Sequence, residues 1–198
     1  FFPDVLVSEA RKEVLALCES LDVDCVLLGE SETKLGAVET WPHAKACGDL
    51  FARHRDSIDG VLVCLPNFGD EKGVADALKL AGLTVPVLVQ AYPDDLGRLQ
   101  VERRRDAFCG KVSVCNNLNQ YGIPYSLTKR HTLPVESAEF RSELVGFLGT
   151  CRVVNGLRGA RIGAIGARPN AFNTTRYSEK LLQSAGISVS TLDLSEVL

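Results

Sequence analysis

The amino-acid sequence predicts an α/β fold: a Rossmann-like parallel sheet with helices on both faces, followed by the start of a second α/β domain. Short apolar runs alternate along the chain with segments of helical period. The runs are apolar throughout rather than alternately polar, which is typical of parallel strands buried on both faces. A long helix and two glycines, Gly156 and Gly159, indicate a boundary, so we expect an amino-terminal domain at 1–158 and a truncated second domain at 159–198.

The first half of the chain predicts five elements. In order they are a helix over 10–21, a strand at Cys25–Leu28, a helix over 44–54, a strand at Gly60–Leu65 and a helix over 74–81. The strand at Gly60–Leu65 is the clearest, because five apolar residues follow one another and Pro66 ends the pairing. Gly82 follows the last helix where a glycine commonly caps a carboxyl terminus.

The second half continues the alternation. We expect a strand at Val85–Val89, a polar segment over 91–107, a helix over 108–121, a strand at Ile123–Leu127, a helix from Glu136, a new β-loop-α unit opening at Arg161–Gly166, a helix over 177–185 and a strand at Ile187–Leu192. Because the first element is a helix and the sequence contains no methionine, we interpret the chain as a fragment that lacks a preceding strand.

Composition excludes several classes of partner. The net charge of −3 gives no basic surface for nucleic acid, and no apolar run reaches the roughly 20 residues that span a bilayer. The seven cysteines are odd in number and have no CxxC spacing, so neither a disulfide framework nor a zinc ribbon is indicated. With no signal peptide in the sequence, a reducing cytoplasm is the expected location.

Two strand-end loops carry the candidate binding residues, because ligands of open parallel sheets bind at the carboxyl ends of strands. The first loop holds Asn67 and Phe68, an amide and an aromatic ring suited to a polar ligand with an apolar face. Its alternative interpretation is a helix cap, with Asn67 or Asp70 capping and Phe68 in the core. Both interpretations can hold together.

The second loop holds Arg168, Asn170 and Asn173, donors for hydroxyl or phosphate groups next to a predicted helix start. Its alternative interpretation is a capping loop. The adjacent carboxylates Asp94 and Asp95 are interpreted as turn formers, and the basic triplet over 103–105 as a solvated surface.

No catalytic or metal site is predicted within the chain. The three histidines, His43, His54 and His131, lack the spacing of metal ligands. The sequence contains no GxSxG motif, no P-loop and no dinucleotide-binding GxGxxG motif.

Several stretches, in one order along most of the chain, resemble the amino-terminal portion of the L-fucose isomerase-like family, which includes enzymes of the L-arabinose isomerase type. The matching stretches are Phe1–Asp4, Asp59–Glu71, Val85–Asp95, Phe108–Lys111 with Asn116–Leu118, and Arg161–Pro169. The resemblance implies an aldose–ketose isomerase that works through an enediol, with Mn²⁺ or a similar divalent metal in the full-length enzyme and none in this chain.

The resemblance also implies roles for the two loops. Catalytic carboxylates and metal ligands would lie beyond residue 198, in a homo-oligomer (trimer or hexamer) that binds a monosaccharide. Asn67 and Phe68 would wall the sugar pocket of a neighbouring subunit, and the loop from Arg168 to Asn173 would line the nearer pocket. The alternative function is a non-catalytic sugar-binding or regulatory module of Rossmann-like fold, since sugar receptors also use such domains.

Overall fold

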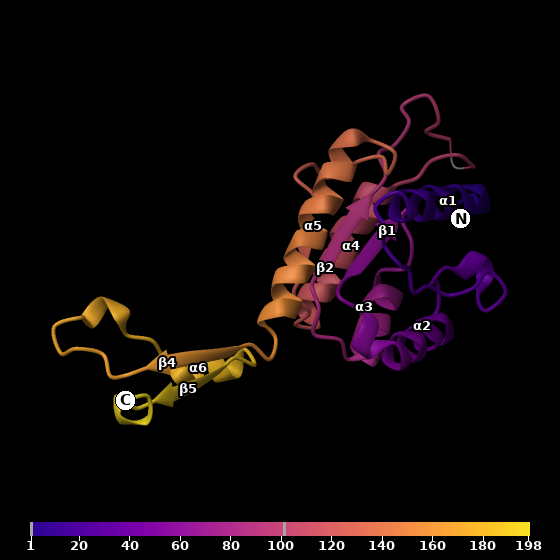
Figure 1. The fold of residues 1–198 in the computed structure, drawn as a ribbon. Helices are drawn as coiled ribbons and strands as arrows, with labels where there is room; N and C mark the ends of the chain where they lie inside the picture. The colour runs from indigo at the N-terminus through magenta and orange to yellow at the C-terminus, as the bar shows by residue number, and fades with distance from the viewer. Residues whose placement is uncertain (1, 101) are drawn as a thin grey trace. The chain divides into compact units, whose positions relative to one another are not determined.

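The computed structural model describes residues 2–100 and 102–198 as a mixed α/β chain (Figure 1). Phe1, in the first of the matching stretches, and Val101, in the polar segment, lie outside the described residues. The chain divides into two compact units, Phe1–Cys151 and Arg152–Leu198. The domain boundary at 158/159 stays a prediction, and the last helix of the first unit, α5, runs on to Leu157.

The first unit is built on a three-stranded parallel sheet of order β1-β2-β3. Strand β1 (Val61–Leu65) pairs with β2 (Val87–Ala91) along its full length, and β2 pairs with the two-residue β3 (Ser126–Leu127). The predicted strand at Ile123–Leu127 is therefore shortened to its last two residues. The helices of the first unit are α1 (Asp4–Glu19), α2 (Trp41–Arg53), α3 (Glu71–Ala81), α4 (Ala107–Gln120) and α5 (Ala138–Leu157).

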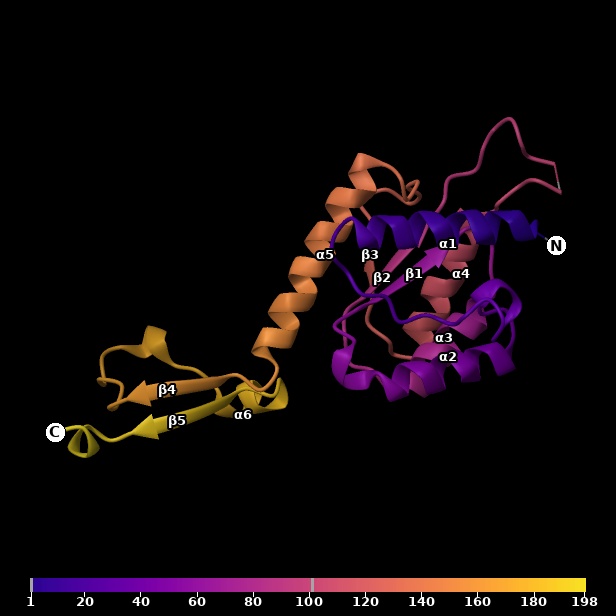
Figure 2. The same ribbon diagram turned by 45° about the vertical axis from the view of Figure 1, so that its right-hand side comes forward.

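Helices cover both faces of this sheet, as predicted (Figure 2). Alternate residues of β1 and β2 point to opposite faces, which is the period of a strand. On one face Val63 and Val89 pack against α3 and α4, and on the other Leu62 and Leu88 pack against α1 and α5. Helix α2 packs on α3 through a third apolar cluster.

The predicted strand at Cys25–Leu28 is wrong. The segment has no regular secondary structure, and among the described residues no backbone N–H of residues 24–28 donates a hydrogen bond to protein. Leu28 is buried against α2 and α3, and the Arg11 guanidinium donates a hydrogen bond to its carbonyl at 2.8 Å. The apolar run therefore indicates that the segment is buried against helices. Strand pairing would require a second strand beside it.

The second unit contains a two-stranded parallel sheet of β4 (Arg161–Ile165) and β5 (Ser188–Leu192). Helix α6 (Glu179–Ser184) connects the strands, and the Ser178 side chain accepts a hydrogen bond from the Leu181 N–H to cap it. Short 3₁₀ turns lie at Asn173–Thr175 and Leu194–Glu196, and the second is closed by a capping box between Asp193 and Glu196.

Candidate functional site: the strand-end loops

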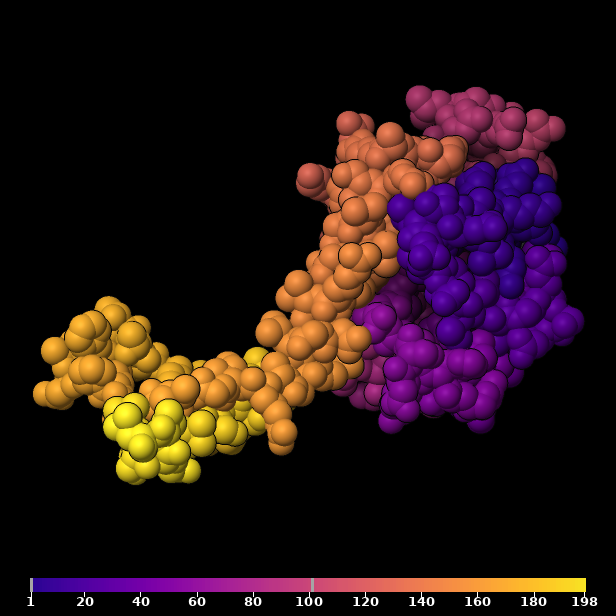
Figure 3. Space-filling view, viewed as in Figure 1, coloured from indigo at the N-terminus to yellow at the C-terminus, as the bar shows by residue number. Residues whose placement is uncertain are grey.

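The carboxyl ends of the three strands of the first unit meet at one edge of the sheet, because all three run parallel. The loops that leave this edge are 66–70 after β1, 92–106 after β2 and 128–137 after β3. Residues 95–100 of the second loop are exposed and protrude from the surface of this unit (Figure 3). This edge is where open parallel sheets bind their ligands.

Asn67 is held by its own loop. Its residue is 9% exposed, and its Oδ1 accepts a hydrogen bond from the Gly69 N–H at 3.0 Å, in a turn that Gly69 closes with φ of 71°. Among the described residues no protein acceptor pairs with its Nδ2 group. Asp70, not Asn67, caps α3 by accepting from the Gly73 N–H. The amide of Asn67 therefore keeps donor capacity for a ligand.

Phe68 lies outside the three buried clusters, so the interpretation that places it in the core is not what the structure shows. Its ring stacks on that of Phe2, with centroids 6.2 Å apart and planes within 2°. Its backbone rests on α4: a Cβ added to Gly110 would lie 2.1 Å from the Phe68 carbonyl oxygen. Gly110 is thus the position that lets α4 approach the β1 loop.

Arg105 fastens the β1 loop from the other side, although the basic triplet was expected to be a solvated surface. Its guanidinium donates a hydrogen bond to the Pro66 carbonyl at 2.8 Å and lies 4.7 Å from the centroid of the Tyr92 ring. The Asp94 carboxylate accepts hydrogen bonds from the backbone N–H groups of Arg105 and Asp106, each at 3.0 Å. Asp94 is therefore the turn former that the sequence predicts.

Tyr92 links the sheet edge to α1. Its hydroxyl donates a hydrogen bond to the Glu13 carboxylate at 2.5 Å, and the residue is 4% exposed. Burial, with a smaller effect of Glu13, raises the pKa of the Tyr92 hydroxyl far above its usual range. The phenol therefore serves as a donor to Glu13 and not as a titrating group.

Lys111 is a buried cation that the sequence analysis did not single out. The residue is 4% exposed, and its ammonium group donates hydrogen bonds to Thr128 Oγ1 and to the His131 carbonyl, both at 2.9 Å. Burial lowers the pKa of Lys111 from its ordinary value. The sequence signal that could have indicated this buried lysine is its position in the predicted helix, between Gly110 and Val114, which are both buried.

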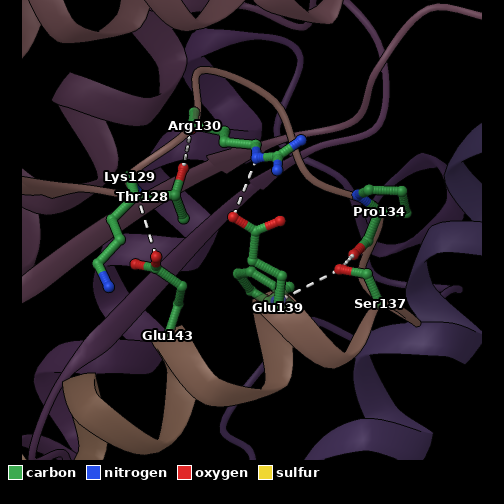
Figure 4. A network of polar contacts seen from close by, with 8 residues as sticks. Thr128, Lys129, Arg130, Pro134, Ser137, Glu139 and Glu143 are labelled. Carbon is green, nitrogen blue, oxygen red and sulfur yellow. Dashed lines mark hydrogen bonds and ion pairs between the residues drawn. The ribbon is translucent and has the colours of Figure 1, made fainter.

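A polar network ties the β3 loop to the start of α5 (Figure 4). The Arg130 guanidinium pairs with the Glu139 carboxylate at 3.0 Å, and the Lys129 N–H donates to Glu143 at 3.4 Å. Ser137 caps α5, since its hydroxyl oxygen accepts from the Phe140 N–H at 3.1 Å. The β3 loop is therefore fixed to two helices, α4 through Lys111 and α5 through this network.

The three residues predicted in the second unit lie together in one exposed loop. The Arg168 guanidinium donates to the carbonyls of Pro169 and Asn170 at 3.1 and 3.2 Å, and to Asn173 Oδ1 at 3.4 Å. The loop does not cap α6, because Ser178 does so. The capping interpretation is therefore wrong, and a binding role for Arg168, Asn170 and Asn173 stays a prediction.

The described residues contain no cluster of three or more His, Cys, Asp or Glu side chains that could hold a metal ion. At the strand-end edge, the Oδ1 atom of Asp94 accepts hydrogen bonds from two backbone N–H groups. The part of the chain that the structure describes therefore shows no ligand set for a divalent metal. Likewise, no helix among the described residues is both long and apolar enough to cross a membrane.

The fold defines a mixed α/β domain built on a three-stranded parallel sheet, with its strand-end loops at one edge. The sequence profile described as Fucose/sulfoquinovose isomerase, N-terminal domain, matches residues 1–158, and the chain belongs to this family. The family consists of aldose–ketose isomerases and is generally metal-dependent. A search of curated proteins finds no match to the chain.

Proposed function

We propose that this chain is the Rossmann-like amino-terminal part of a cytoplasmic aldose–ketose isomerase, and that it contributes binding contacts to a monosaccharide site. The family match over residues 1–158 carries this proposal. Its second support is the strand-end edge, where the Asn67 amide keeps donor capacity and the next residue, Phe68, supplies an aromatic ring. An amide donor next to an apolar ring suits a sugar, which presents hydroxyl groups around an apolar ring face.

The work of the domain in this proposal is to bind and orient the sugar. Isomerisation through an enediol moves a proton between C1 and C2, which requires a positioned acid–base group. The side chains assigned to the sugar in this loop, Asn67 and Phe68, carry no acid–base group, and the neighbouring Arg105 is engaged by the Pro66 carbonyl. We therefore assign proton transfer, and the Mn²⁺ or similar metal of the enzyme, to residues outside this chain.

The proposal includes the assembly. Asn67 and Phe68 stand on an open edge of the first unit, so a second surface is needed to enclose a sugar there. We assign that surface to a neighbouring subunit of a homo-oligomer, a trimer or hexamer. The loop of Arg168, Asn170 and Asn173 would then line the pocket of its own subunit, with the Arg168 guanidinium exchanging a loop carbonyl for a sugar hydroxyl.

The test compares the intact protein that carries this domain with the isolated 198 residues. Both are assayed for ketose formation from L-fucose, L-arabinose and sulfoquinovose with Mn²⁺ present. The intact protein should turn over at least one of the sugars, and Asn67→Ala should raise its KM several-fold. The isolated chain should be inactive. Turnover by the isolated chain would refute the assignment of catalysis to other residues.

A further inference from the structure

An aromatic residue and a histidine lie together at the same sheet edge without a role in the site described so far. Phe108, in the first turn of α4, is 44% exposed, and its ring centroid lies 5.0 Å from that of the exposed His131, with the planes tilted by 36°. The two residues come from different elements, since His131 belongs to the β3 loop. A phenylalanine that stays this exposed forgoes the stabilising free energy that the burial of its ring in the core would contribute.

The pair is fixed in place by the backbone beneath it. Lys111, three residues after Phe108, donates a hydrogen bond to the His131 carbonyl at 2.9 Å. The same ammonium group holds Thr128 Oγ1, which in turn donates to the Arg130 carbonyl at 2.7 Å. The backbone of the β3 loop is thus held at Thr128 and at His131. The imidazole of His131 is therefore attached to a fixed backbone.

The start of α4 lies between the β1 loop and the β3 loop, with Gly110 against the Phe68 backbone and Phe108 against the His131 ring. Gly110 lies two residues after Phe108 and contacts the Phe68 backbone, so the start of α4 joins the β1 loop to the β3 loop. One helical turn therefore carries Phe108, the contact to Phe68 and the anchor of His131. Asn67, Phe68, Phe108 and His131 all belong to the carboxyl edge of one sheet.

We propose that Phe108 and His131 extend the Asn67–Phe68 wall as specificity-determining contacts for a monosaccharide, with Lys111 as the positioning residue of His131. This inference rests on the proposed function. An aromatic ring takes the apolar C–H face of a pyranose, and an imidazole can donate to or accept from a hydroxyl group at the ring's edge. Neither residue transfers a proton in the reaction, so their loss weakens binding and leaves the chemical step intact.

The experiment measures KM and kcat of the intact protein for Phe108→Ala, His131→Ala and Lys111→Met, with L-fucose as the first substrate. Each variant should raise KM about tenfold, which corresponds to about 1.4 kcal/mol of binding, with kcat within twofold of the wild type. His54→Ala is the matched control, because His54 is an exposed histidine that follows α2 at its carboxyl end, and its KM should stay unchanged.

Two outcomes overturn the inference separately from the proposed function. If Asn67→Ala raises KM while Phe108→Ala and His131→Ala do not, the pair is not part of the wall. If the wild type turns over no aldose, the proposed function fails, and saturation-transfer NMR of L-fucose on the intact protein then decides the inference. Reduced saturation of the sugar ring protons in Phe108→Ala supports the wall, and unchanged saturation refutes it.

Discussion

Gly110→Ala tests the contact that joins α4 to the β1 loop. The new Cβ would lie 2.1 Å from the Phe68 carbonyl oxygen and 2.7 Å from the Phe68 carbonyl carbon and Cα. An ordinary carbon–oxygen contact is about 3.3 Å or longer, so the loop must move by roughly 1 Å. Backbone atoms cannot rotate away as a side chain can, so we place the cost near the upper end of overpacking, at about 3 kcal/mol.

Helix propensity acts in the opposite direction, because alanine is favoured over glycine in a helix interior by about 1 kcal/mol. The net effect should be a loss of about 2 kcal/mol in the free energy of unfolding, measured from urea midpoints. Gly146→Ala is the matched control: this helix-interior glycine of α5 has no atom within 4 Å of an added Cβ, so the same substitution should stabilise by up to about 1 kcal/mol. Equal stabilisation by both variants would refute the close approach of Phe68 to α4.

Three further predictions concern single residues of the same edge. Phe68→Ala should raise KM of the intact enzyme several-fold with little change in the urea midpoint, whereas a drop of about 3–5 kcal/mol with unchanged KM would return Phe68 to the core. Tyr92→Phe should lower the free energy of unfolding by about 2 kcal/mol, because it removes a buried hydrogen bond to the Glu13 carboxylate; an unchanged midpoint would show that the bond contributes nothing. Lys111 has a pKa lowered by burial, so the unfolded chain binds more protons between that pKa and the ordinary value of 10.5, and stability should rise with pH across this window. In Lys111→Met this rise should be lost, and a slope identical to the wild type in urea titrations at several pH values would contradict the burial of the cation.

The elements that the sequence predicted well are those whose signals are local. Strand β1 is five apolar residues followed by Pro66, and α3 begins at the Asp70 cap and ends at Gly82, which adopts φ of 60° and donates to the Leu78 carbonyl. Each of these signals depends on residues a few positions apart. The resemblance to the isomerase family likewise holds, and the match covers residues 1–158.

The elements that it missed depend on partners distant in the sequence. Cys25–Leu28 has the composition of a strand, but pairing requires a neighbouring strand, and within the described ranges 2–100 and 102–198 β2 is the only strand paired with β1. Arg105 reaches the Pro66 carbonyl 39 positions away, and Lys111 reaches the β3 loop about 20 positions on. A triplet of arginines and a helical lysine look like solvated charges until the fold supplies their acceptors.

The candidate site divides in the same way. Arg168, Asn170 and Asn173 lie close in sequence, and the structure brings them into one loop. Asn67 and Phe68 follow a clear strand, which the rule for parallel sheets places at the ligand-binding edge. Phe108 and His131 come from two elements whose contact only the tertiary structure shows, so no spacing in the sequence marks them as a pair.

The measurement that tests the central claim most directly is the conversion of aldose labelled with ¹³C at C1 by the intact protein in D₂O, followed by NMR. An isomerase working through an enediol should produce the ketose and place solvent deuterium on C1 of the product or, on reversal, on C2 of the aldose. Saturable binding of the sugar without ketose and without deuterium incorporation would contradict the account and establish a sugar-binding module instead.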